Sequence, residues 1–178
     1  KSKRDKFVDK LIDALFQIQG GYSLILMTNK KMIGVRDPFG IRPLVIGKLK
    51  KTYIIASETC ALDIVGASLV REVENGEIVV VENDEIKSIK PFPKQKARPC
   101  VFEYIYFARP DSLIDGKCAY EYRKKLGAEL AKEADVKADF VVPVPDSGVP
   151  AALGFASESK KQFELGLIRN HYVGRTFI

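Results

Sequence analysis

The segment VVPVPDSGVPAALGFA, residues 141–156, combines residue types that can bind an anion. An apolar run leads into Asp146, Ser147 and Gly148, and the residues after them predict a helix. Such a turn, at the carboxyl end of a parallel strand, is where open α/β sheets bind ligands, and its amides and the helix N-terminus can hold a phosphate. Gly148 would let the backbone approach that anion closely. Spacing by itself favours the alternative, a helix cap in which Asp146 or Ser147 binds free amides and Pro150 occupies the first turn.

A second polar cluster lies in GVRDPFGIRPLVIG, residues 34–47. Arg36, Asp37 and Arg42 are residue types that could clamp a carboxylate substrate. The prolines and glycines around them favour another interpretation, a buried turn closed by ion pairs. The sequence therefore predicts a structural role for this cluster rather than a binding site.

The last ten residues, RNHYVGRTFI, contain two arginines and the only histidine of the chain. A basic terminus of this kind is, without further information, expected to be a solvated tail. One histidine cannot supply a metal cluster, no cysteine pair has zinc spacing, and no Walker or dinucleotide-binding loop is present in the sequence. As a self-contained enzyme the chain is therefore poorly equipped.

The composition of the chain limits which partners and which cellular environment can be expected. The formal charge is +6, but the basic residues are dispersed, as in KLKK, KQK and RKK. Solvated surface is the favoured interpretation, anionic small-molecule ligands come next, and nucleic acid is not expected as a partner. No apolar run approaches ~18 residues, so no membrane association is predicted. The three cysteines are widely spaced and odd in number, which indicates a reducing cytoplasm and no disulfide framework.

The elements that must position these residues follow from periodicity. In the first half, apolar spacing predicts a helix that ends at Gly20-Gly21, followed by short strands in a meandering antiparallel sheet. The expected strands are YSLILMT, MIGV, LVIG, YIIAS and EIVVVE, with turns at Asn29, Asn75-Gly76 and Asn83-Asp84. Ser57 and Glu58, in ASETCALD, are typical of a helix start.

Residues 91–99, PFPKQKARP, are predicted to be a linker, because three prolines in nine positions cannot lie in a sheet interior. Beyond them, CVFEYIYFA, FVVPV and ELGLI are expected to be strands. Helices are expected in VPAALGFA and in the segment marked by Tyr122, Leu126 and Leu130. This alternation predicts the opening of a parallel α/β sheet.

Six segments in order, GGYSL, RDPFGIRPL, ASETCALD, CVFEYIYFARPDS, VPVPDSG and NHYVGRTFI, together resemble the glutamine phosphoribosylpyrophosphate amidotransferase family. The resemblance covers nearly the whole chain, and FEYIYFARPDS followed by NHYVGRTFI is its most specific part. It implies an α+β protein in which residues 1–92 are the C-terminal part of an N-terminal-nucleophile glutaminase, an αββα fold. Residues 93–99 would be the linker, and residues 100–178 the start of a type I phosphoribosyltransferase α/β domain.

Members of this family release ammonia from glutamine and join it to phosphoribosylpyrophosphate, giving phosphoribosylamine in the first step of purine synthesis. The resemblance therefore implies phosphoribosylpyrophosphate and glutamine as substrates, Mg²⁺ as cofactor, purine nucleotides as inhibitors and a cytoplasmic homo-oligomer. The family's nucleophile, an N-terminal cysteine, would lie before Lys1, and its acidic phosphoribosylpyrophosphate motif after Ile178. The chain is thus expected to be an internal fragment that by itself hydrolyses no glutamine.

The resemblance assigns two parts of a substrate site. Asp146, Ser147 and Gly148 match the pyrophosphate loop. Some members have a serine that contributes to the magnesium site where this chain has Gly148, so backbone contact to phosphate is expected there instead. The flexible loop that covers phosphoribosylpyrophosphate begins with residues that match Arg169, Asn170, His171, Tyr172 and Arg175.

Cys100 matches the first ligand of a [4Fe-4S] cluster in one branch of the family, although members without a cluster also have a cysteine there. A buried, inert cysteine is the favoured interpretation. Arg109 and Asp111, in ARPDS, are expected to support the junction between the domains.

Two other functions remain open from the sequence. A non-catalytic module could use the basic loop to bind nucleotides or nucleic acid, and its binding to an oligonucleotide would depend steeply on salt. A protein similar to asparagine synthetase would share the first half of the chain, but this reading leaves residues 100–178 unexplained.

Overall fold

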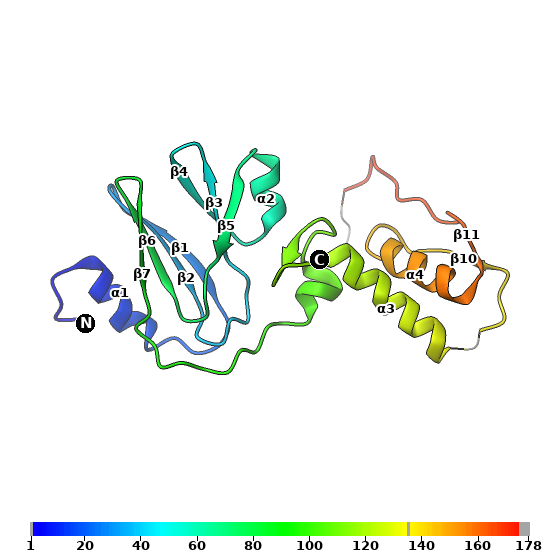
Figure 1. Cartoon of the computed structure of the whole chain (residues 1–178), viewed down its shortest axis with the longest axis horizontal. Coiled ribbons are helices and arrows are strands. Elements are labelled where there is room, and N and C mark those ends of the chain that lie inside the picture. The colour runs from blue at the N-terminus through cyan, green and yellow to red at the C-terminus, as the bar shows by residue number, and fades with distance from the viewer. Residues whose placement is uncertain (1, 135, 175–178) are drawn as a thin grey trace. The chain divides into compact units, whose positions relative to one another are not determined.

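The computed structural model describes residues 2–134 and 136–174 of the chain. The chain divides into two compact units, Lys1–Val101 and Phe102–Ile178 (Figure 1). No helix in the described part of the chain is both long enough and apolar enough to cross a membrane.

The first unit contains two antiparallel sheets where the sequence predicts one meandering sheet. The first sheet has the order β1-β2-β6-β7 and consists of β1 (Ser23–Met27), β2 (Met32–Arg36), β6 (Ile78–Glu82) and β7 (Glu85–Ile89). The second has the order β4-β3-β5 and consists of β3 (Val45–Leu49), β4 (Thr52–Ala56) and β5 (Ser68–Glu72). The chain leaves the first sheet after β2 and returns with β6, which pairs with β2. The meander is thus interrupted by the entire second sheet.

Two strands lack a clear signal in the sequence. Leu69 and Val70 of β5 are neighbours that are both exposed, so this strand shows no alternation of apolar and polar residues. β7 is mostly polar, and it forms because it pairs with β6 along its whole length. Pairing with a neighbour, rather than local propensity, therefore decides both strands.

Alternating side chains divide the first unit into four layers. α1 (Phe7–Leu15) packs on the outer face of the first sheet, and α2 (Thr59–Ile64) packs on the outer face of the second. The space below α1 is filled by Leu15, Tyr22, Ile33, Val35, Ile78 and Val80. The space between the sheets is filled by Leu44, Ile46, Ile55, Val73 and Val79. Below α2 lie Val45, Leu62 and Ala67. Because side chains alternate along a strand, Ile78 and Val80 face α1 while Val79 faces the second sheet. This order of layers confirms the αββα prediction.

The local signals at element ends are mostly confirmed. Asn83 and Asp84 form the two-residue turn between β6 and β7, with φ angles of 51° and 60°, a conformation that these residue types tolerate. α2 begins directly after Ser57 and Glu58, although no side chain makes a capping hydrogen bond to it. α1 ends at Leu15, so the prediction that Gly20-Gly21 ends this helix is wrong.

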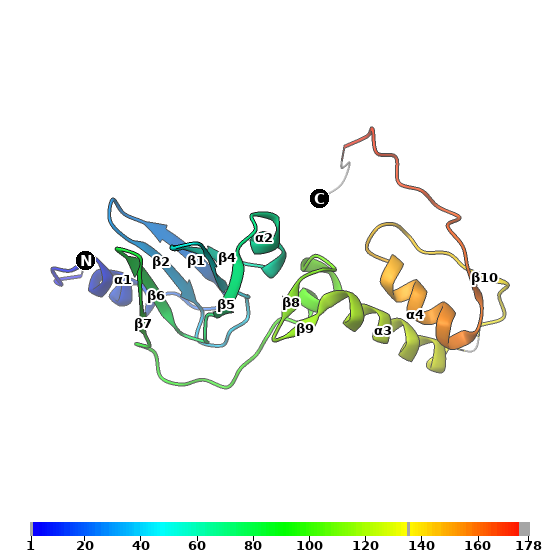
Figure 2. The ribbon, with the colours of Figure 1, turned by 45° about the horizontal axis from the view of Figure 1, so that its top comes forward.

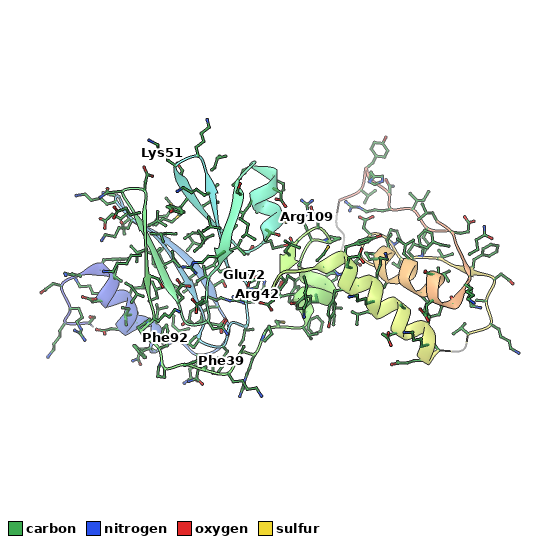
Figure 3. The ribbon with its side chains drawn as sticks, in the orientation of Figure 1. Phe39, Arg42, Lys51, Glu72, Phe92 and Arg109 are labelled. Carbon is green, nitrogen blue, oxygen red and sulfur yellow. The ribbon has the colours of Figure 1, made fainter. Side chains whose placement is uncertain are left out.

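The predicted linker has no regular structure, but it is attached to the first unit. The Arg98 N–H donates to the Phe39 carbonyl at 2.8 Å, and the Cys100 N–H donates to the Ile41 carbonyl at 3.2 Å. The rings of Phe92 and Phe16 lie 5.0 Å apart, and Phe92 and Phe39 lie along this edge of the unit (Figure 3). Residues 92–100 therefore follow the surface of the first unit instead of extending freely.

The second unit is smaller and mainly helical. It begins with one π-helical turn, η1 (Glu103–Phe107), and a short hairpin of β8 (Leu113–Ile114) and β9 (Lys117–Cys118). α3 (Ala119–Glu133) and α4 (Val149–Ser159) pack side by side (Figures 1 and 2). β10 (Phe140–Val141) and β11 (Gln162–Phe163) form a parallel pair, as the strand–helix alternation predicts.

Three predicted strands of this unit require correction. CVFEYIYFA is not a strand, because residues 103–107 form η1 and the Ala108 N–H donates to the Glu103 carbonyl at 3.1 Å. A short apolar run cannot be assigned to strand or helix by periodicity alone. FVVPV is reduced to Phe140–Val141, since Pro143 has no N–H to donate to a partner. ELGLI is not a strand, because β11 ends at Phe163.

The contact between α3 and α4 depends on glycines rather than on leucines. A Cβ atom at Gly127 would run into the Ala151 carbonyl, and one at Gly154 would run into the Lys124 carbonyl. Leu126 and Leu130, which mark the apolar face in the sequence, are 41% and 54% exposed. The α3 helix is therefore predicted correctly, but the face that it buries is not.

Candidate functional site

The turn between β10 and α4 closes on itself through its own backbone. The Gly148 N–H donates to the Val144 carbonyl at 3.1 Å, and the Val149 N–H donates to the Asp146 carbonyl at 3.3 Å. A Cβ atom at Gly148 would lie 2.7 Å from the Val144 carbonyl oxygen, so any side chain there would force the backbone to move. Packing within the turn therefore accounts for the glycine.

This geometry corrects two expectations about the turn. Gly148 occupies the N-cap position of α4 and no side chain caps the helix, so a cap by Asp146 or Ser147 is wrong, although Pro150 does lie in the first turn. The Gly148 amide is already bound, so it is not the group that would contact an anion. Among residues 2–134 and 136–174, the N–H groups of Asp146 and Ser147 have no hydrogen-bond partner, so both are amides of this turn that an anion could use.

A cavity of ≈ 580 Å³ adjoins this turn within the second unit. Its lining comes from three segments: η1, the turn before α4 and the segment after β11. The lining residues are Tyr106, Pro145, Asp146, Ser147, Arg169, Asn170, Val173 and Gly174. Two groups that are far apart in the chain and that the sequence assigned to one site thus meet in one cavity.

An ion pair joins the two sides of the cavity lining. Arg169 Nη1 donates to Asp146 Oδ2 at 2.9 Å, with side chains that are 59% and 66% exposed. The cavity therefore has a cation whose charge is balanced by a carboxylate in the same lining. Because both side chains are largely solvated, the pair is weak and opens readily.

The remaining loop residues contribute less to the cavity. The Tyr172 side chain is fully exposed, and its N–H donates to Asn170 Oδ1 at 3.0 Å. His171 is exposed and is not part of the lining. Arg175 lies outside the described residues. Asn170 thus holds the local turn at residues 170–172, and the Tyr172 ring faces solvent.

Tyr106 is a lining residue that the sequence does not indicate, because it lies within an apolar run with no local functional signal. Its position depends on Arg123 of α3, a residue that is only 4% exposed. Arg123 Nε donates to the Tyr104 carbonyl at 2.7 Å, and its Nη2 donates to the Ala108 carbonyl at 2.8 Å. Moving the buried Arg123 guanidinium away from these carbonyls would leave its charge without hydrogen bonds, which is energetically unfavourable. Arg123 therefore fixes η1 and with it Tyr106.

The chemistry available in this cavity is binding rather than bond cleavage. Its described lining offers one guanidinium, one carboxylate, the hydroxyls of Ser147 and Tyr106, the Asn170 side-chain amide and free backbone amides, which suit a phosphate or pyrophosphate group. No set of three or more His, Cys, Asp or Glu residues in the described part of the chain could hold a metal ion. For Mg²⁺, which keeps several waters and binds substrate phosphates, Asp146 and Ser147 would supply only a partial, open site.

The Arg36–Arg42 turn of the first unit is confirmed as structural. The Asp37 carboxylate, fully buried, accepts four backbone N–H groups, from Tyr22, Phe39, Ile41 and Arg42, at 2.9–3.4 Å. Arg36 donates to the carbonyls of Arg42 and Val73 at 2.9 and 2.7 Å and lies 3.6 Å from a Glu72 oxygen. The ion pair that closes this turn therefore joins Arg36 to Glu72.

Glu77 and Tyr22 are among the ionisable groups of the first unit that have perturbed pKa values. Burial acts to raise the pKa of the Glu77 carboxyl, but hydrogen bonds from Arg71, the Glu74 amide and Ser88 outweigh it, so this pKa is lowered. The Arg71 guanidinium binds Glu77 through two bonds of 2.8 and 2.6 Å. Burial, with a smaller contribution from the Asp37 charge, raises the pKa of the Tyr22 hydroxyl. Both groups lie in the scaffold and not in the cavity.

The cysteines do not form a cluster site by themselves. Cys60 is buried, its thiol 3.7 Å from Glu58 Oε2, while Cys100 and Cys118 are half-buried. An iron–sulfur cluster needs several thiolates close together, and Cys100 is not grouped with other candidate ligands among the described residues. The residues that the structure describes therefore do not by themselves fit a complete cluster.

Comparisons with known proteins bear on both units. A glutamine amidotransferase domain family matches residues 5–63. Amidophosphoribosyltransferase from Rhizobium etli is 55% identical and is aligned with 100% of this chain. The enzyme of that name from Synechocystis is 50% identical over 99% of this chain, and the chloroplastic enzyme from Glycine max is 49% identical over 99%. A solved structure, glutamine phosphoribosylpyrophosphate amidotransferase from B. subtilis complexed with ADP and GMP, covers 100% of this chain with a TM-score of 0.95 and 46% identity.

The chain spans about a third of the length of these relatives: 37% for Rhizobium etli, 36% for Synechocystis and 31% for Glycine max. It covers 39% of the chain in the B. subtilis structure. The match runs through residues of both units, including those after the linker that a resemblance to asparagine synthetase would leave unexplained.

Proposed function

This chain is homologous over its whole length to amidophosphoribosyltransferases, and from this premise we propose that it acts as part of such an enzyme. The reaction is the transfer of glutamine-derived ammonia to phosphoribosylpyrophosphate, the first step of purine synthesis. The observation that carries the proposal is the 55% identity to the Rhizobium etli enzyme across both units. A match confined to the first unit would suit any glutamine amidotransferase of this fold class.

Each unit has a part in the proposal. Residues 1–92 belong to the glutaminase domain and supply its αββα scaffold. Residues 93–99 are the linker, and residues 100–178 begin the phosphoribosyltransferase domain. The break between compact units at Val101 and Phe102 supports this division.

The cavity of the second unit is the proposed binding site for the pyrophosphate group of phosphoribosylpyrophosphate. Arg169 would bind a phosphate oxygen as a charged donor, and the Ser147 N–H would bind another. Asn170 would hold the loop turn, and Tyr172 would exclude water when the loop closes. His171 and Arg175 are proposed as further phosphate contacts of the same loop.

Magnesium and the other partners follow from the same proposal. Asp146 and Ser147 would hold Mg²⁺ together with the pyrophosphate, and the ion would neutralise phosphate charge there. Purine nucleotides are proposed as inhibitors, since the B. subtilis relative was solved with ADP and GMP. We further propose that the enzyme is a homo-oligomer, that it lies in the cytoplasm, and that it has no nucleic-acid or membrane partner.

The test is binding of phosphoribosylpyrophosphate to this chain by calorimetry, comparing wild type with Arg169→Gln. Loss of a charge-assisted contact should weaken binding about ten-fold. Arg109→Gln is the matched control, because Arg109 is also exposed and also pairs with an aspartate at 2.9 Å. Its affinity should match wild type.

Two results would contradict the proposal. Equal losses in both variants would indicate a non-specific charge effect. Tighter binding of an oligonucleotide than of phosphoribosylpyrophosphate, with a steep salt dependence, would favour the nucleic-acid-binding module instead.

A further inference from the structure

The Arg169–Asp146 ion pair engages the same guanidinium that an incoming anion needs. Arg169 and Asp146 both line the cavity, and their side chains are bonded at 2.9 Å. The two residues come from different segments, one after β11 and the other before α4. An anion that enters the cavity must therefore compete with the Asp146 carboxylate for Arg169.

The pair is suited to exchange because it is held only weakly. Both side chains are more than half exposed, so water solvates each charge when the pair opens. The contrast with Arg123 is informative, since that guanidinium is buried and bound to two carbonyls. Arg123 cannot change partners without leaving a buried charge, whereas Arg169 can.

The turn at 170–172 adds a consequence. Asn170 follows Arg169 directly, and its Oδ1 atom accepts the Tyr172 N–H at 3.0 Å. Where the exchange displaces the Arg169 backbone, the adjoining turn moves with it, including the exposed Tyr172 ring. Movement of this segment can then be coupled to the presence of an anion.

We propose that the Arg169–Asp146 pair is a latch: without substrate it holds the Arg169 guanidinium on the Asp146 carboxylate, and it opens when pyrophosphate takes Arg169. This rests on the proposed function, because it assumes that the cavity receives a pyrophosphate group. Opening also releases the Asp146 carboxylate beside the bound anion, where it becomes available to a divalent cation. The latch thus makes release of the carboxylate dependent on the anion.

The test uses inorganic pyrophosphate without metal and a double-mutant cycle on this chain. The four proteins are wild type, Asp146→Asn, Arg169→Gln and the double variant, with affinities measured by calorimetry. Asp146→Asn removes the competitor for Arg169, so pyrophosphate affinity should rise about two- to five-fold. The rise should vanish in the Arg169→Gln background, because the latch needs both partners.

Asp111→Asn is the matched control for net charge. Asp111 is an exposed aspartate of the same unit, 53% exposed and paired with Arg109 at 2.9 Å, and its substitution should leave the affinity unchanged. An unchanged or lower affinity in Asp146→Asn would overturn the latch. A rise that persists without Arg169 would also overturn it, in favour of simple repulsion by the carboxylate.

The outcomes separate the latch from the proposed function. If wild type binds pyrophosphate but the four affinities do not follow the predicted cycle, the latch is wrong and the proposed binding site still stands. No pyrophosphate binding by any of the four proteins would overturn both.

Discussion

Two turns of this chain each follow a strand and place an aspartate next to a proline, yet they use the carboxylate in opposite ways. In the first unit, Asp37 is fully buried and accepts four backbone N–H groups. In the second unit, Asp146 is exposed and is bound by one arginine side chain. In the first turn the carboxylate oxygens accept hydrogen bonds that hold the fold, whereas in the second turn they remain accessible to a ligand. Burial, rather than residue type, separates the structural aspartate from the candidate functional one.

The same contrast extends to the two units. The first unit has three buried clusters between four layers. The second has a small core of Tyr104, Ala108, Ile114 and Ala119, and its other close contact is made by glycines. Around β10 and β11 many large apolar side chains are exposed, namely Phe140, Val142, Val144, Leu165, Leu167 and Ile168. Exposed apolar surface of this kind is typical of a face that another segment or chain covers.

The largest expected effect is that of Asp37→Asn. One carboxylate oxygen becomes an NH₂ group that cannot accept the N–H donors facing it, and the charge is lost. The free energy of unfolding of the first unit should fall by about 3–5 kcal/mol, a large part of the stability of a small domain. Urea unfolding followed by circular dichroism measures this change. A loss below about 1 kcal/mol would show that the buried bonds of Asp37 are dispensable and would remove the contrast between the turns.

Glu77→Gln should have the next largest effect. One of the two acceptor oxygens that bind Arg71 becomes an NH₂ group and the charge is lost, but Arg71 is 37% exposed and can be solvated, so the expected loss is about 2–3 kcal/mol. Glu74→Gln is the control, because its pair with Lys90 is 65% and 51% exposed and should contribute less than about 1 kcal/mol.

The effect of Glu77→Gln should also depend on pH. The folded-state pKa of Glu77 is lowered, so its stabilisation is present above the ordinary value of 4.5 and is lost as pH falls toward the folded-state value. Wild type and variant should therefore converge in stability as the pH falls below 4.5 toward the folded-state pKa. A constant difference from pH 7 to pH 3 would argue against this assignment.

Gly127→Ala tests the contact that holds the second unit. The added methyl would run into the Ala151 carbonyl, and overpacking of this kind costs about 1–3 kcal/mol, partly offset by the better helix propensity of alanine. Thermal unfolding of the variant should therefore occur at a lower temperature. Gly174→Ala is the control, because no atom of the residues that the structure describes lies within 4 Å of a Cβ atom there. Equal unfolding temperatures would mean that α3 and α4 can separate at little cost.

The smallest effect is expected for Asp146→Asn. Loss of one exposed ion pair should change the free energy of unfolding by less than about 0.5 kcal/mol. The free energies of unfolding of this variant and of Asp37→Asn, measured under the same conditions, compare the two aspartates directly. A loss above about 2 kcal/mol would make Asp146 a structural residue like Asp37.

The sequence by itself determined the features that depend on neighbouring residues. Five strands of the first unit, the helix after Gly148 and the Asn83–Asp84 turn follow from alternation, turn chemistry and a proline in the first helical turn. These signals act over a few residues, so they are present before the chain folds. The expectation that the turn at residues 146–148 belongs together with Arg169 and Asn170 also came from the sequence, through resemblance to a family, and these segments line one cavity.

Tertiary structure alone decided which groups are buried and which are left free. The first unit splits into two sheets because β6 pairs with β2 across about forty intervening residues, which form the second sheet and its turns. Local signals in the sequence do not specify a strand partner at that distance. Tyr106 enters the cavity only because the buried Arg123 holds η1 in place. The Gly148 amide, expected to meet an anion, is instead bound to Val144, and that choice depends on how the turn closes. Burial and hydrogen-bond partners are properties of the whole fold, so residue types and spacing can propose a site but not assign each atom in it.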